Sequence, residues 1–326
     1  MNHSKPVGLY LHIPFCSYRC SYCDFNTYTS LGDLKTVYAD ALCTEIEQVG
    51  GETPAGHRRP VKTIFFGGGT PSLMSSDQIG RILNTVRTQF DLDPTAEVTM
   101  EANPETVDEA YLAAVHAHGV NRLSFGAQSA IASELQTLGR EHTFQKVIDA
   151  VDTARQVGFD NLSIDLIYGV PGQTLASWEQ SVTAALDLGT DHLSLYCLTI
   201  EPGTPMQRWL NTGQIQPPDP DLAADQYDLT REKLAAHGFE HYEISNWSRP
   251  DHASQHNLVY WRNGEYLGLG AGAHGHANAH RYHIVRQPRV YIRRLLEQSP
   301  HEAHYPWSTA VAEQFPLDEQ DQMGET

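Results

Sequence analysis

Hydrophobic positions alternate between two spacings along the first 200 residues. Short apolar runs, typical of buried strands, alternate with longer segments that have apolar residues at helical spacing. The predicted strands are 7–12, 63–66, 97–101, 122–125, 162–167 and 192–198. The predicted helices are 75–90, 107–118, 144–157 and 175–188, with Ser76, Thr106, Thr143 and Thr174 as the residues that start them. This alternation predicts an α/β fold with a parallel sheet.

The pattern changes after residue 200. The run Pro217-Pro218-Asp219-Pro220 interrupts the alternation, and 221–237 has the spacing of a helix. The segment from 313 to 326 is acidic and contains no Lys or Arg. We therefore expect three parts, at 1–200, 201–312 and 313–326.

Composition narrows the class of protein. A chain of 326 residues with 40% hydrophobic residues can bury the core of one large domain or two smaller ones. Its formal net charge of −18 disfavours nucleic acid as a partner, because neutralising phosphates requires clustered Lys and Arg. No apolar run approaches the ~20 residues of a transmembrane helix, and the N-terminus lacks a signal pattern. We expect a cytoplasmic protein.

Three of the five cysteines, Cys16, Cys20 and Cys23, share one short loop with the spacing C-x3-C-x2-C. A [4Fe-4S] cluster normally takes four cysteines, so a loop that supplies three leaves one iron open to a small molecule. Cys20 and Cys23 alone could also be half of a zinc site or a redox dithiol. Zinc would need a second pair of ligands at similar spacing, whereas Cys43 and Cys197 are isolated. The spacing favours the cluster.

The cysteine loop resembles that of the radical S-adenosylmethionine (SAM) superfamily, whose hallmark is C-x3-C-x2-C after the first strand. A second segment, Phe65-Phe66-Gly67-Gly68-Gly69-Thr70-Pro71-Ser72, is similar to the family's glycine-rich SAM-binding turn. The resemblance implies a partial (β/α)6 TIM-like barrel with a C-terminal α+β extension. It also implies reductive cleavage of SAM to a 5′-deoxyadenosyl radical, an electron donor such as a flavodoxin or ferredoxin, and a further small C-terminal domain that would be missing here.

Polar residues of the predicted barrel fall at the carboxyl ends of strands, where ligands gather in such folds. Glu101 and Asp165 end mostly apolar strands, where a carboxylate is costly unless it meets a ligand or partner. Arg140 can pair bidentately with a carboxylate. Taken singly, each is more often a surface or structural residue. Together, eight residues match in order the SAM-binding positions of the oxygen-independent coproporphyrinogen III oxidase group: Tyr10, Gly68, Gly69, Thr70, Glu101, Gln128, Arg140 and Asp165.

That group contains both an oxidase, which converts porphyrinogen propionates to vinyls, and a haem chaperone, which passes haem to acceptor proteins. The oxidase loop continues C-x2-C-x-C, whereas Phe25 stands at the place of that extra cysteine. The run His256-Asn257-Leu258-Val259-Tyr260-Trp261 is similar to the H-N-x-x-Y-W motif of the chaperone branch. The resemblance therefore favours a chaperone that carries a cluster and SAM, with haem and haem-acceptor proteins as partners. The oxidase, or a cluster used only for structure or electron transfer, remains an alternative.

Histidines crowd the segment that contains this motif, namely His252, His256, His274, His276, His280 and His283. The imidazole of His256 could ligate haem iron while Tyr260 and Trp261 pack against the macrocycle. Alternatively, His256 hydrogen-bonds a loop and the two aromatic residues fill core. Nearby, 270–275 matches G-x-G-x-x-G but lacks the helix and the acidic residue of a dinucleotide site. We expect close backbone packing there, at the open edge of the barrel.

Overall fold

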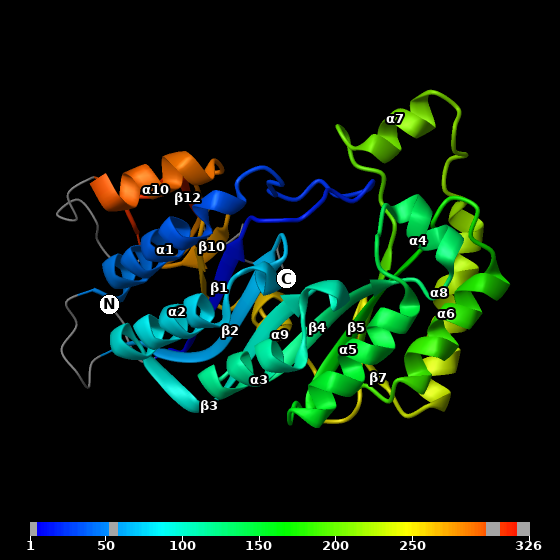
Figure 1. Cartoon of the computed structure of the whole chain (residues 1–326), viewed down its shortest axis with the longest axis horizontal. Coiled ribbons are helices and arrows are strands. Elements are labelled where there is room, and N and C mark those ends of the chain that lie inside the picture. The colour runs from blue at the N-terminus through cyan, green and yellow to red at the C-terminus, as the bar shows by residue number, and fades with distance from the viewer. Residues whose placement is uncertain (1–4, 52–57, 298–306, 318–326) are drawn as a thin grey trace.

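The computed structural model describes residues 5–51, 58–297 and 307–317 as a curved open sheet with helices along one side (Figure 1). Six strands run parallel in the order of the sequence. They are β1 Val7–Ile13, β2 Pro60–Gly68, β3 Asp91–Ala102, β4 Arg122–Gln128, β5 Asn161–Tyr168 and β6 His192–Cys197. The predicted α/β fold with a parallel sheet is confirmed.

The helices follow the strands and pack side by side, α1 against α2, α2 against α3 and α3 against α5 (Figure 1). The four predicted helices are confirmed as α2 Ser76–Gln89, α3 Glu109–His118, α5 Phe144–Gln156 and α6 Leu175–Asp187, with Thr143 and Thr174 at the N-cap positions of the last two. Helix α8, predicted over 221–237, spans Pro220–Ala236. Those not predicted are α1 Lys35–Gly50, α4 Ala132–Leu138, α7 Pro205–Asn211, α9 Gln255–Trp261 and α10 Pro288–Glu297.

One predicted helix start was wrong. Ser76 is the first residue of α2 as predicted, although it is the Ser75 side chain that caps this helix by accepting a hydrogen bond from the backbone N–H three residues on. Asp108, not Thr106, caps α3 in the same way, because Thr106 belongs to a separate 3-10 helix, Pro104–Thr106. An N-cap residue lies just outside the helix and has an extended backbone conformation. Ser75 and Asp108 both have this conformation.

Residues after 200 extend the sheet at both edges. Beside β1 lie β9 Tyr266–Leu269, β10 His274–Ala277, β11 His280–Ile284 and β12 Val311–Pro316. Beside β6 lie β8 Asn246–Ser248 and β7 Glu240–Glu243. The expected acidic tail begins within β12, and its residues 318–326 lie outside the described part of the chain. No helix in the described ranges is long and apolar enough to cross a membrane.

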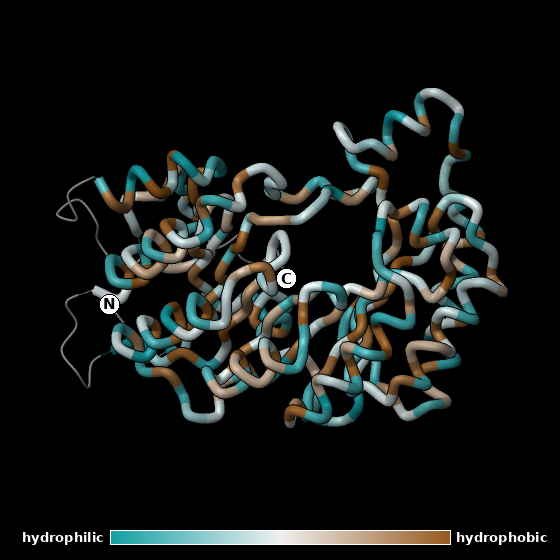
Figure 2. The backbone as a smooth tube through the Cα atoms, in the orientation of Figure 1, coloured by the Kyte–Doolittle hydropathy of each residue, from teal (hydrophilic) through white to brown (hydrophobic). Residues whose placement is uncertain are grey.

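Strand alternation separates the core from the site. Leu9, Leu11 and Ile13 of β1 are fully buried and belong to the main core, to which the helices also contribute. Each such side chain contributes about 1.5–3 kcal/mol by leaving water. Hydrophobic stretches accordingly run along the strands and alternate with hydrophilic ones along the helices (Figure 2). Tyr10 and His12 point to the opposite, concave side of the sheet, so polar groups of several strands converge there.

Candidate functional site

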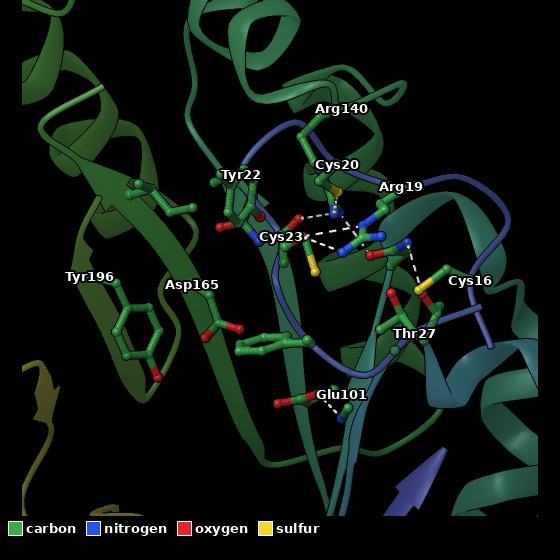
Figure 3. Close-up of a pocket in the computed structure, with 18 of the residues that line it drawn as sticks. Cys16, Arg19, Cys20, Tyr22, Cys23, Thr27, Glu101, Arg140, Asp165 and Tyr196 are labelled. Carbon is green, nitrogen blue, oxygen red and sulfur yellow. Dashed lines mark hydrogen bonds between the residues drawn. The ribbon is translucent and has the colours of Figure 1, made fainter. Parts of the chain in front are cut away.

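A cavity of about 390 Å³ opens at the carboxyl ends of β2 to β6, and the cysteine loop forms one of its walls (Figure 3). The structure brings most of the predicted site residues together here. Those that line the cavity are Cys16, Cys20, Cys23, Gly68, Gly69, Thr70, Glu101, Gln128, Arg140 and Asp165. Of the predicted residues, Tyr10 and His256 do not line it.

The cysteine loop is held in place by backbone hydrogen bonds on both of its sides. The N–H of Cys16 donates to the carbonyl of Tyr28 over 3.1 Å. At the other side, Ser21 donates to the carbonyl of Leu138, also over 3.1 Å, and its own carbonyl accepts from Met206 of α7 at 2.9 Å. Helices α4 and α7, which the sequence did not predict, thus position the loop.

The three thiols are free and half-buried. Burial raises the pKa of the Cys16 thiol and raises that of Cys23 to about 11, so thiolates here require a cation to stabilise them. No three His, Cys, Asp or Glu side chains in the described ranges are close enough to hold one metal ion. An iron–sulfur cluster makes a different demand, because each thiolate binds a different iron, and three soft thiolates on one cavity wall fit it.

Arg140 reaches into the cavity from the loop after α4 (Figure 3). Its Nη1 donates to Sγ of Cys20 at 3.4 Å, and its Nη2 donates to Oδ1 of Asn103 at 2.8 Å. Its Nε is buried and has no acceptor among the described residues. A buried donor without a partner costs about 1–3 kcal/mol, so the guanidinium has capacity left for an anionic group.

The glycine turn packs against the base of the cysteine loop. Gly69 donates to the carbonyl of Ile13 at 2.8 Å, and Thr70 donates to that of Phe15 at 2.8 Å. A Cβ on Gly69 would lie 2.6 Å from the oxygen of Phe15, and Gly68 has φ +112°. Side chains are therefore excluded at both positions. Besides leaving room for a ligand, these glycines let the two motifs approach each other.

Two carboxylates face the cavity from the floor of the barrel (Figure 3). Oε2 of Glu101 accepts from the N–H of Gly68 at 3.1 Å, and Oδ1 of Asp165 accepts from the Ser124 hydroxyl at 2.9 Å. Burial, with a smaller contribution from Asp165, raises the pKa of Glu101 to about 8, and burial also raises the pKa of Asp165. Neither forms a salt bridge within the described ranges. A cationic ligand would stabilise both in their charged form.

Gln128 ends β4 with φ +66°, in the left-handed region that non-glycine residues rarely adopt. The β4–β5 register shifts between Gly126 and Gln128, so the strand bends at this point. The side-chain amide then lies against the cavity, where a Cβ on Gly126 would meet its Nε2 at 2.7 Å. Strained backbone of this kind is frequent where a side chain must face a ligand.

Several residues of the cavity were not singled out from the sequence as ligand-binding positions. Asn103 links the glycine turn to Arg140, because its Nδ2 donates to Oγ1 of Thr70 and its Oδ1 accepts from Arg140. Tyr196 and Cys197 reach the cavity from the end of β6. Their position at the carboxyl end of a barrel strand was the available signal, because the same rule identified Glu101.

Tyr10 and His256 lie outside this cavity. The Tyr10 hydroxyl donates to Nδ1 of His12 at 3.0 Å, and Nε2 of His12 donates to the carbonyl of Asn26 at 3.1 Å. Burial lowers the pKa of His12 to about 4, so its imidazole is neutral and has both nitrogens engaged.

His256 is fully buried, and its ring nitrogens lie 2.9 Å from Oγ1 of Thr63 and 2.8 Å from the Tyr260 hydroxyl. This geometry corresponds to the hydrogen-bonding alternative, and it leaves no nitrogen free for a haem iron. Tyr260 and Trp261, by contrast, are 40% and 50% exposed. The two aromatic residues of the motif are thus available at the surface rather than filling core.

The predicted close packing at 270–275 is present. A Cβ on Gly270 would lie 2.5 Å from the carbonyl oxygen of His12, and the segment connects β9, which pairs with β1, to β10. Nδ2 of Asn26 donates to the carbonyls of Ala271 and Arg286, each at 2.9 Å. The end of the cysteine loop is therefore fastened to the C-terminal extension.

Comparison with known proteins agrees with this geometry. Residues 10–185 match the radical SAM superfamily. The protein "Heme chaperone HemW" of Mycobacterium tuberculosis H37Rv is 42% identical over 89% of this chain and 75% of its own length, and that of Bacillus subtilis is 38% identical over 89% and 76%. The structure of coproporphyrinogen III oxidase (HemN) from Escherichia coli, 26% identical, superposes with a TM-score of 0.83 over 99% of this chain and 74% of that one. The expected partial barrel is confirmed, and the chain belongs to the radical SAM superfamily, in its HemW-like branch.

Proposed function

We propose that this protein is a haem chaperone that carries a [4Fe-4S] cluster, binds SAM and transfers haem to acceptor proteins. The observation that carries the proposal is the identity of 42% and 38% to proteins named as haem chaperones, against 26% to the coproporphyrinogen oxidase. Phe25 supports it, because this exposed side chain stands where the oxidase loop is expected to carry a further cysteine.

Cys16, Cys20 and Cys23 are the proposed cluster ligands. When bound, the cluster supplies an electron that can cleave the sulfonium of SAM. The chain's own groups would tune the sulfurs, since Thr70 donates to Sγ of Cys16 at 3.7 Å and Arg140 donates to Sγ of Cys20. Such hydrogen bonds favour the thiolate. A flavodoxin or ferredoxin is the class of electron donor we propose.

The charges of the cavity complement those of SAM. SAM carries a sulfonium, an ammonium and a carboxylate, and the cavity offers Glu101, Asp165 and Arg140. In the proposed arrangement the unpaired Nε of Arg140 meets the methionyl carboxylate, while the two acids face the ammonium or the ribose hydroxyls. Gln128 adds a neutral amide. Ligand binding would thereby relieve both the unsatisfied donor and the cost of burying the carboxylates.

Haem transfer tests the proposal. The cluster-loaded protein is saturated with haem under anaerobic conditions and mixed with the apo form of a haem-dependent enzyme. We expect the enzyme to regain activity faster than with the same concentration of free haem, in reactions run with and without SAM. Slower recovery than with free haem would show that the protein sequesters haem, and it would contradict the chaperone function.

The oxidase is the second candidate, because the oxidase structure superposes on nearly the whole chain. The oxidase activity would convert propionate groups of coproporphyrinogen to vinyl groups and would consume one SAM for each propionate converted. A cluster that serves only structure or electron transfer is the third, and an absence of SAM cleavage would favour it.

A further inference from the structure

A second cavity, of about 440 Å³, borders the cluster cavity on the side of β1, β9 and β10. Phe25, Gly68 and Glu101 line both cavities. An adjoining hollow of about 400 Å³ shares Tyr260, Tyr266 and His274 with the second cavity. The two hollows together form a groove, which we call the side groove, that extends outward from the proposed SAM site.

We propose that the side groove seats haem, with His274 as the ligand of the iron and Arg286 paired with a propionate. This inference rests on the proposed haem-chaperone function and names the site at which that function would occur. It replaces His256 as the candidate ligand within the histidine-rich segment.

We choose His274 as the iron ligand because of the hydrogen bonding and exposure of the imidazoles near the groove. His12 and His274 are the histidines that line the second cavity, and both nitrogens of His12 are hydrogen-bonded. His256 is buried with both nitrogens engaged. The ring of His274 is exposed and makes no hydrogen bond among the described residues. Haem iron binds an accessible neutral imidazole nitrogen, and His274 offers one.

The strand pairing holds His274 in a defined position. His274 starts β10 and lies directly opposite His283 of β11. The two rings stack with centroids 5.5 Å apart and planes inclined by 28°. Because β10 is joined to β1 through β9, the imidazole stands on the sheet rather than on a loose loop. Because the strand pairing already restrains the imidazole of His274, it loses little conformational freedom when it binds the haem iron.

The remaining walls suit a flat, largely apolar macrocycle with charged edges. The rings of Tyr10, Phe25, Tyr260 and Tyr266 line the groove, and Phe25 is 64% exposed. Aromatic side chains contribute large contact areas to planar ligands. The exposed Arg286 lies in the lining of the same cavity, and guanidinium pairs well with carboxylate. Imidazole, aromatic walls and a cation thus converge on one groove.

Haemin contains iron and protoporphyrin IX does not. Comparing their binding affinities therefore separates the contribution of iron ligation from that of packing against the macrocycle. Cluster-loaded protein is titrated with each porphyrin and the Soret band is followed. His274→Ala should weaken haemin binding by about tenfold or more, since even outer-shell changes cost metal sites about 10–100-fold, and it should shift the Soret band. Its affinity for protoporphyrin IX should not change, because that molecule has no iron to ligate. His280→Ala, in the neighbouring strand β11, is the matched control and should bind both porphyrins as the wild type does.

Arg286→Gln tests the other half of the site. It should weaken binding of haemin and protoporphyrin IX by the same factor, about three- to fivefold, the effect of losing one exposed ion pair. It should not affect binding of the dimethyl esters, which lack the propionate charges.

The outcomes distinguish this inference from the proposed function. If the wild type binds haemin and His274→Ala binds it equally well, or loses both porphyrins alike, His274 is not the ligand and the chaperone function stands. If the wild type binds neither porphyrin, the proposed function itself fails.

Discussion

Replacing Glu101 with glutamine should stabilise the protein when no ligand is bound. Burial raises the pKa of Glu101 from an unfolded value near 4.5 to about 8. The folded state therefore holds a proton that the unfolded chain releases between these values, and the wild type loses stability as the pH rises through this window. Glutamine does not titrate, and its side-chain oxygen can still accept from Gly68.

The size of the effect follows from the two pKa values. At pH 7 the penalty carried by Glu101 is about 3 kcal/mol, and at pH 5 it is below about 1 kcal/mol. The advantage of Glu101→Gln over the wild type should thus grow by about 2 kcal/mol between pH 5 and 7 and level off above pH 8–9.

Urea unfolding followed by circular dichroism at pH 5, 6, 7 and 8 measures this, on metal-free protein without SAM. Glu232→Gln, which makes the same replacement at an exposed position, is the control. The free energy of unfolding of Glu101→Gln could instead exceed that of the wild type by an amount that is constant or that shrinks with rising pH. Either result would refute the conclusion that the ionised carboxylate of Glu101 is destabilised when no cation is bound. The same variant should bind SAM more weakly if the acid serves the ligand.

Three further predictions concern the cysteine loop and its supports. Cys20→Ser should abolish the visible absorbance of the reconstituted cluster yet leave haem binding measurable, and an equal loss of both would count against separate sites. Gly69→Ala should destabilise the protein by about 1–3 kcal/mol in urea unfolding, because its Cβ meets the Phe15 carbonyl. Gly32→Ala, with nothing within 4 Å of its Cβ, should stay within about 0.5 kcal/mol of the wild type, and equal effects at both positions would argue against the close approach. Asn26→Ala should cost about 1–3 kcal/mol by the same measurement, since two carbonyls of the extension lose their donor; an unchanged midpoint would show that the loop does not depend on them.

The parallel strands and the cluster motif were predictable because their signals are local. Each barrel strand contains a short, mostly apolar run, and the proposed ligand-binding residues lie near the ends of such runs or in a short motif. Helix α1 was missed although Tyr38, Leu42, Ile46 and Val49 have helical spacing. Its N-cap is Leu34, which makes no side-chain cap bond, so the usual start signal is absent.

The C-terminal extension was less predictable because its structure depends on distant residues. Strands β7 to β12 are short and pair across the sheet edges, which local patterns do not encode. The environment of His256 is set by Thr63, 193 residues away in the sequence. Sequence alone therefore identified the histidine-rich segment, and only the structure could separate the buried His256 from the exposed His274.

Haem titration and coproporphyrinogen III turnover, assayed anaerobically on one cluster-reconstituted sample with SAM and a reductant, decide between the haem chaperone and the oxidase. We expect saturable haem binding and no vinyl product. Formation of the vinyl product with stoichiometric methionine would contradict the chaperone function and make this protein the oxidase despite Phe25.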